Sequence, residues 1–176
     1  MCLRMREFIT TIGSRETPAD ICNIMSLIGA RLQNKYILRS GGAIGADKAF
    51  EKNVKPENKY IYTVKNFDYS QENYDFVYSE LMSIWDKDLN FDLYEKTSQI
   101  LLLRDINQVL GSRKTSLEKS KFLICYTKHE RYYEIGKNRV GGSRIAIRCA
   151  LKHGIKVHNL VNPETLKTVK TWLNIV

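Results

Sequence analysis

The sequence predicts an α/β fold: a Rossmann-like parallel sheet of about five strands flanked by helices. Two observations support this prediction. Short β-branched runs alternate along the chain with segments of helical periodicity, and glycine-rich loops follow some of these runs. Such alternation favours parallel strands joined by right-handed crossovers. The length of 176 residues and a hydrophobic content of 43% suit a single domain spanning 1–176.

The first half of the chain predicts three strands and two helices. The β-branched run EFITTIG, at 7–13, is interpreted as the first buried strand. Thr17 as N-cap and Pro18 at the first helical position predict a helix directly after it. A second strand, a short helix and a third strand are expected at 36–39, 46–53 and 59–64.

A helical insertion, acidic and rich in aromatic residues, is expected after the third strand, at about 65–93. Residues 66–95 hold eight acids against Lys87, a net charge of −7, and the insertion region carries eight of the chain's 18 aromatic residues. The insertion could cover a pocket or form the contact of a homo-oligomer. Packing of the aromatic residues onto the body of the domain is the favoured interpretation.

The last part of the chain predicts two more strands and three helices. A longer helix is expected from Leu93 to Leu110, ended by Gly111. A fourth strand, a glycine loop that opens a helix, and a fifth strand are expected at 121–127, 139–154 and 156–160. Asn162 and Pro163 then cap a final helix that runs to Asn174.

The chain is basic, with 28 Lys and Arg against 19 Asp and Glu, a formal charge of +9. Most of the excess lies in residues 119–156, where ten bases face two acids. This balance favours a nucleotide or single-stranded nucleic acid as partner. A solvated basic surface is the alternative explanation.

Cysteine usage and hydropathy bear on the compartment. The four cysteines lie far apart with no CxxC pair, and no apolar run approaches the ~20 residues that span a bilayer. The N-terminal segment turns charged too early for a signal peptide. We therefore expect a reduced, cytoplasmic protein with no membrane contact.

Three loops at strand ends predict a phosphate site: GSRE at 13–16, SGGAIGAD at 40–47 and VGGSR at 140–144. Ligands of open parallel sheets bind beyond the carboxyl ends of the strands, where strand order reverses. Glycine lets backbone N–H groups approach an anion, and a helix N-terminus adds about half a positive charge. The expected phosphate or nucleotide ligands are Gly13, Ser14, Arg15, Ser40, Gly41, Gly42, Gly45, Asp47, Arg104, Gly141, Gly142, Ser143 and Arg144. A tight strand-to-helix turn is the alternative for each loop. The loop SGGAIGAD matches neither GxGxxG nor a Walker P-loop.

Single residues of these segments leave alternatives open. Asp47 could bind a ribose hydroxyl or cap the following helix, the favoured interpretation. Arg104 could reach a phosphate or lie on the surface beside a glycine C-cap. Cys125 stands where a nucleophile would be well placed, but a buried structural thiol is favoured.

The loop 127–139 interleaves cations with tyrosines, which suits stacking of bases and pairing with phosphates in a single strand. Its candidate nucleic-acid ligands are Lys128, Arg131, Tyr132, Lys137 and Arg139. A mobile basic loop without a ligand is the alternative. The three histidines show no metal-ligand spacing, so neither a metal site nor a cofactor is assigned.

The GSR loop, SGGAIGADKAFE and GGSRIAIRCALKHGIKVHNL together resemble the SLOG superfamily, in particular its small DprA-like and YspA-like members from bacteria and phages. RDINQVLG, at 104–111, is similar to an arginine-containing helix of phage members. The resemblance covers most of the chain apart from the insertion. It implies a Rossmann-like nucleotide-binding protein acting in DNA or nucleotide metabolism or in ligand sensing, in the host cytoplasm if the chain is phage-encoded.

The sequence departs from the family members that hydrolyse nucleoside monophosphates. Their PGGxGTxxE motif carries a glutamate, whose place here falls on Ala146 or Arg148. A hydrolase that cleaves an N-glycosidic or phosphoester bond therefore stays an alternative to a binding protein. It would need a carboxylate from another loop, with Asp47, Glu51 and Glu16 as candidates.

Overall fold

The computed structural model describes residues 6–85, 90–128 and 142–175. Over these residues the chain forms a parallel five-stranded sheet of order β3-β2-β1-β4-β5, which confirms the predicted fold class. The strands are β1 (Glu7–Gly13), β2 (Tyr36–Ser40), β3 (Lys59–Ile61), β4 (Phe122–Tyr126) and β5 (Lys156–Asn159). The order places β1 beside β4, at the point where the direction of strand addition reverses.

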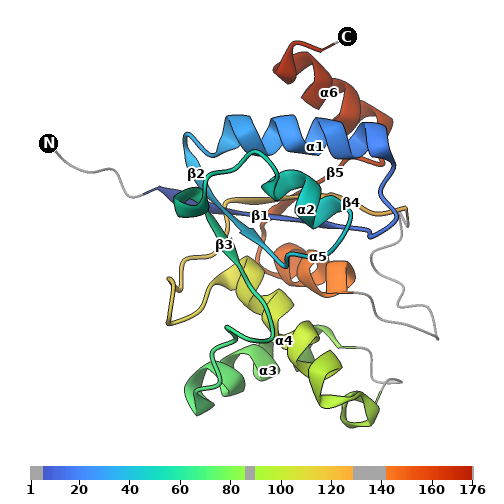
Figure 1. Ribbon diagram of the computed structural model, residues 1–176. Coiled ribbons are helices and arrows are strands. Elements are labelled where there is room, and N and C mark those ends of the chain that lie inside the picture. The colour runs from blue at the N-terminus through green and yellow to red at the C-terminus, as the bar shows by residue number, and fades with distance from the viewer. Residues whose placement is uncertain (1–5, 86–89, 129–141, 176) are drawn as a thin grey trace, which may run out of the picture.

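Helices cover both faces of the sheet (Figure 1). They are α1 (Ala19–Leu32), α2 (Ala46–Glu51), α3 (Gln71–Ile84), α4 (Lys96–Leu110), α5 (Gly142–Lys152) and α6 (Pro163–Leu173). On one face α1, α2 and α6 pack against Ile124 and Tyr126, whereas α4 and α5 pack against Leu123 and Cys125 on the other. This alternation within β4 is the two-residue period of a strand buried on both faces.

Some element boundaries differ from the sequence prediction. Thr17 does not cap α1, because its hydroxyl donates to the Ser14 carbonyl at 2.7 Å, and Pro18 occupies the N-cap position without a side-chain cap. The helix expected from Leu93 starts at Lys96, because Phe91–Leu93 form a separate 3₁₀ turn. The cap at Asn162 is confirmed: its Oδ1 accepts from two backbone N–H groups of α6.

The aromatic insertion packs onto the domain, as favoured by the sequence. Helix α3 buries Val77 and Leu81 against α4 and α5. The rings of Trp85 and Phe91 meet edge to face, with centroids 5.6 Å apart. The insertion therefore adds helix α3 to the α4 and α5 side of the domain, away from the sheet (Figure 1).

The segment that follows α4 is held by a buried arginine that the sequence did not single out. The Arg39 guanidinium, from β2, donates to the carbonyls of Glu118 at 2.6 Å and Ser116 at 3.1 Å, and it lies 3.8 Å from the Phe8 ring centroid. Gly111 ends α4 with φ of 84°, a conformation that favours glycine. These contacts hold the connection between α4 and β4 against β2.

None of the helices in residues 6–85, 90–128 and 142–175 is long and apolar enough to cross a bilayer.

Candidate functional site

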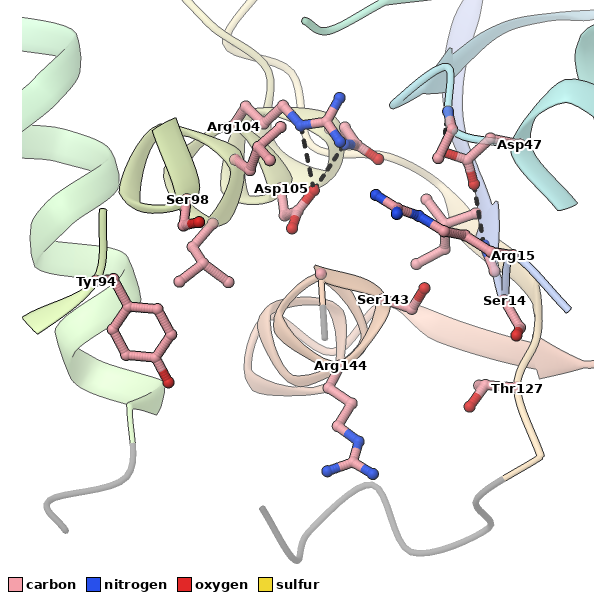
Figure 2. Close-up of a pocket in the computed structure, with 17 residues that line it drawn as sticks. Ser14, Arg15, Asp47, Tyr94, Ser98, Arg104, Asp105, Thr127, Ser143 and Arg144 are labelled. Atoms are coloured by element: carbon pink, nitrogen blue, oxygen red, sulfur yellow. Dashed lines mark hydrogen bonds and ion pairs between the residues drawn. The ribbon is translucent and has the colours of Figure 1, made fainter. Parts of the chain in front are cut away.

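A pocket of about 520 Å³ lies beyond the carboxyl ends of β1 and β4, where the strand order reverses. Its walls come from the loop after β1, the loop after β2, the inner face of α4 and the first turn of α5 (Figure 2). The backbone of Ser14 joins these parts: its N–H donates to the Tyr126 carbonyl at 2.8 Å and its carbonyl accepts from Ala46 N–H at 3.1 Å. The site thus lies where open parallel sheets place their ligands.

The N-terminus of α5 opens on this pocket. Gly142, Ser143 and Arg144 all line it, and N–H groups in the first turn of a helix have no intrahelical partner. Figure 2 shows the Arg15 side chain pointing into the pocket from the β1 loop, while the Arg144 side chain extends away from Asp105. Donors and positive potential therefore converge at this end of the pocket.

Two adjacent residues of α4 form an ion pair on the pocket wall that lies against Gly142. Asp105 is 5% exposed, accepts a hydrogen bond from Gln108 Nε2 at 2.8 Å and lies 3.9 Å from Arg104 Nε. Burial raises the pKa of Asp105 to about 7, and the negative charge of Asp47 acts in the same direction. Arg104 and the hydrogen bond from Gln108 lower it. Asp105 can therefore hold or release a proton near neutral pH.

Arg104 is not a surface side chain. Its Nη1 donates to the carbonyls of Gly41, at 2.5 Å, and Tyr62. The guanidinium thereby connects α4 to the ends of β2 and β3, and part of it remains on the pocket wall. This position is compatible with the predicted role at an anion, but the donors of Nη1 are already used.

The Asp47 carboxylate caps the glycine loop instead of the helix. It accepts from the backbone N–H groups of Gly13, Gly41 and Ala43 at 3.1, 3.2 and 3.3 Å. Burial raises its pKa to about 6, whereas the hydrogen bonds from Ala43 and Gly13 lower it. The N-cap position of α2 is Gly45, which has no side-chain cap, so the favoured capping role of Asp47 is wrong.

At the glycines of the first loop, the space that a side chain would fill is occupied by other parts of the protein. A Cβ at Gly41 would lie 3.0 Å from both Nη atoms of Arg104. Gly45 has a φ of 91°, and a Cβ there would overlap the Ser14 carbonyl and lie 2.7 Å from the Arg15 Cα. The close approach that the sequence indicated at SGGAIGAD is therefore made by a guanidinium and by the β1 loop.

The structure brings together only part of the predicted phosphate site. The predicted residues that line the pocket are Gly13, Ser14, Arg15, Asp47, Arg104, Gly142, Ser143 and Arg144. Those that do not line it are Ser40, Gly41, Gly42 and Gly45. Ser40 is buried and donates to Glu51 Oε1 at 2.7 Å, so both are engaged away from the pocket, and Glu16 is exposed outside it.

The predicted nucleic-acid loop falls mostly outside the described residues, as do Gly141, Arg131, Tyr132, Lys137 and Arg139. Lys128 is described and exposed, directly after Thr127 on the pocket wall.

Sequence reasoning missed the residues of the α4 side. Asp105 and Gln108 line the pocket, and Tyr94, Ser98 and Leu101 form its far wall. The available signal was an acid three residues before an amide within an apolar helix, a spacing that brings the two side chains together. Because a surface position of Arg104 beside a glycine C-cap fitted this segment equally well, the spacing did not identify a buried acid.

The remaining reactive side chains lie elsewhere. Cys125 is fully buried, as favoured, and burial raises the pKa of its thiol well above the ordinary value. His153 pairs with Glu80, with 2.9 Å between Nε2 and Oε2. Across the part of the chain that the structure describes, no group of three His, Cys, Asp or Glu side chains could hold a metal ion.

Comparison of the sequence with protein-family models and with curated proteins finds no match. Among solved structures, the chain is similar to DNA processing protein A from Helicobacter pylori, a structure described for its unique mode of binding single-stranded DNA. The sequence identity is 15%, the alignment covers 96% of this chain and 80% of that chain, and the TM-score is 0.36. At this level of similarity the comparison assigns neither a family nor an activity.

Proposed function

We propose that the chain binds a phosphate-bearing nucleotide in the pocket between β1, β4, α4 and α5, with a phosphate at the N-terminus of α5. One observation carries the proposal: an eleven-residue helix starts at Gly142 and opens directly into a pocket at the point of strand-order reversal. An anion there meets unpaired backbone donors and the positive end of the helix. The Ser143 hydroxyl and Arg15 supply further donors.

The size and the two ends of the pocket support a nucleotide over a free anion. About 520 Å³ is within the range of sites for small organic ligands. Tyr94 and Leu101 give the wall opposite the β1 loop an apolar character, on which a base can pack. The phosphate end and the base end thus differ in chemistry.

A single-stranded nucleic acid is the second ligand class. Lys128 is exposed beside the pocket, and ten of the chain's basic residues fall in 119–156. A strand with one phosphate at α5 would pass Lys128, which follows Thr127 on the pocket wall. Such binding must weaken steeply with salt, because it releases counterions from the strand.

Hydrolysis of a nucleotide is a second candidate function, favoured by Asp105. A carboxyl group with a pKa of about 7 inside a ligand pocket suits a general acid. This residue replaces Glu16 and Glu51 as the acidic candidate, since neither lines the pocket. If the chain is a hydrolase, free base or free phosphate accumulates from a nucleotide, and Asp105→Asn slows that release.

The test is a thermal-unfolding panel against mononucleotides, dinucleotides and short single-stranded DNA, at low and moderate salt. A bound ligand raises the midpoint with the logarithm of its concentration over Kd. We expect a salt-resistant shift from a mononucleotide. A shift from oligonucleotides alone, fading with salt, would instead favour a nucleic-acid surface, and no shift from any of them would overturn the proposal.

Gly142, the first residue of α5, and Gly154, two residues beyond its end, give matched variants for this test. A methyl group at Gly142 would lie 2.5 Å from Asp105 Oδ2, whereas one at Gly154 meets no atom within 4 Å. Gly142→Ala should weaken nucleotide binding at least about tenfold, because it crowds the mouth of the helix. Gly154→Ala, whose φ of 67° costs about 1 kcal/mol of folding free energy, should leave Kd unchanged. Equal affinity in both variants would remove the α5 terminus from the site.

A further inference from the structure

We propose that anion binding in this pocket is linked to protonation of Asp105: the ligand phosphate and the ionised carboxylate exclude each other, so that binding takes up a proton from solvent. This inference rests on the proposed function and specifies what the site demands of its ligand.

The geometry places the Asp105 carboxylate where the phosphate is expected. Asp105 Oδ2 lies so close to Gly142 that a Cβ there would be 2.5 Å from it. The Asp105 side chain, on α4, thus faces the first residue of α5, where the positive potential of that helix is greatest. An ionised Asp105 therefore acts as a built-in anion at the N-terminus of α5. A second anion at the same place meets its charge at short range in a desolvated site.

The charged groups around Asp105 do not compensate for a second negative charge. Arg104, on α4, is the adjacent cation, but Nη1 serves two carbonyls and Nε is 3.9 Å from Asp105 Oδ1. Asp47, on α2, adds a buried carboxylate that opposes ionisation of Asp105. Arg15 points into the pocket from the β1 loop, where an incoming phosphate can reach it, whereas the Arg144 side chain extends away from Asp105 (Figure 2). Taking up one proton restores the charge balance when the phosphate enters.

Gln108 allows Asp105 to change its protonation state without losing its hydrogen bond. The amide is 1% exposed; its Nε2 donates to Asp105 Oδ1 at 2.8 Å, while its Oε1 has no partner among the described residues. Rotation of the amide exchanges Nε2 for Oε1. A protonated Asp105 can then donate to Gln108, so the contact exists in both states. The raised pKa of Asp105, about 7, means that this proton is taken up at little cost near neutrality.

The experiment uses probes whose own charge is constant from about pH 6 to about pH 9: inorganic sulfate and a dinucleotide with only a phosphodiester. A mononucleotide is unsuitable here because the second pKa of its phosphate is about 6. Calorimetry of the whole chain in two buffers of different ionisation enthalpy gives the protons taken up per probe bound. We expect uptake approaching one proton at about pH 8 and falling toward zero at about pH 6, with Kd rising up to about tenfold per pH unit above 7.

Asp105→Asn should abolish proton uptake and make Kd independent of pH, with binding at about pH 8 at least as tight as that of the unmodified protein. Asp92→Asn is the matched control, because it removes the same charge from an exposed position that does not line the pocket and should preserve the uptake. If the unmodified protein binds a probe without proton uptake, this inference is overturned while the proposed function stands. If it binds neither these probes at any pH nor a mononucleotide, the proposed function itself fails; binding of a mononucleotide without either probe would overturn this inference alone. The proton count of the unmodified protein decides the matter even if Asp105→Asn does not fold.

Discussion

The two glycine loops of this chain look alike in sequence and differ in what fills them. In residues 40–47 the backbone N–H groups of Gly41 and Ala43 donate to Asp47, a carboxylate of the same loop and helix. At Gly142 the chain begins a helix whose first turn faces the pocket. Glycine clusters therefore report a close approach to the backbone, but not whether a ligand or the protein itself makes it.

The difference extends to the atoms that a larger residue would meet. At Gly45 these atoms are backbone of Ser14 and Arg15, which cannot yield without moving the β1 loop. At Gly142 they belong to the side chain of Asp105 alone. We therefore expect changes in the first loop to act on folding and changes at the second to act on binding.

Gly45→Val should have the largest effect. It combines a φ of 91°, which a β-branched residue rarely adopts, with overlap between the new Cβ and the Ser14 carbonyl. We expect the free energy of unfolding to fall by about 4 kcal/mol or more, measured by urea denaturation followed by far-ultraviolet circular dichroism. A variant that unfolds at the usual urea concentration but no longer binds nucleotide would reverse the assignment of the two loops.

The next largest effect should be the pH dependence of stability. It tests the pocket beside α5, because Asp105 lies there. The pKa of Asp105 is about 7 in the folded chain, against about 4 in an unfolded one. Between these values the folded state holds a proton that the unfolded state has released, so stability falls as pH rises through this window and then levels off. The pKa of Asp47, raised to about 6, acts in the same direction.

We expect the free energy of unfolding to be about 3 kcal/mol lower at about pH 8 than at about pH 5, measured by urea titration. Asp105→Asn should remove most of this difference by raising stability at the higher pH. Stability that instead increased from the lower pH to the higher would mean that the carboxylate is stabilised in its ionised form, and the account of Asp105 would be wrong.

The fold was predictable because each strand is a short β-branched run and each helix has its own apolar period. Such local patterns survive tertiary packing, and the start of α6 at Asn162 and the end of α4 at Gly111 were also determined locally. The cap of α1 was not predictable, because the Thr17 hydroxyl is taken by the Ser14 carbonyl, a contact that depends on the path of the loop.

The site was predictable only where the main chain alone defines it. The order of the strands placed Gly13 and Gly142 at one edge, as the alternation of strands and helices implied. The destination of Asp47 was not predictable, since its hydrogen bonds join residues up to 34 positions apart in the sequence. Asp105 was not predicted for the same reason. Its raised pKa comes from burial in the folded chain, and the sequence around Arg104 and Asp105 does not show that this acid is buried.

The smallest expected effects come from removing the hydroxyl of one serine in each loop. Ser40 donates to Glu51 Oε1 at 2.7 Å in the buried first loop, and Ser143 lies on the pocket wall in the first turn of α5. Ser40→Ala leaves a buried carboxylate oxygen short of a donor, so the free energy of unfolding should fall by about 1 to 2 kcal/mol with Kd for nucleotide unchanged. Ser143→Ala should weaken binding about threefold to tenfold, the value of one hydrogen bond, with no change in the unfolding midpoint.

Both variants are to be measured by the same two methods, urea denaturation and equilibrium titration with the mononucleotide that binds best. A crossed result, in which one serine moves only stability and the other only affinity, requires that the loops have separate roles. If Ser40→Ala weakened binding and left stability intact, the hydrogen bond to Glu51 would be dispensable and the first loop would be the one that holds the phosphate. Because each serine loses the same hydroxyl, the contrast depends on location and not on the chemistry of the substitution.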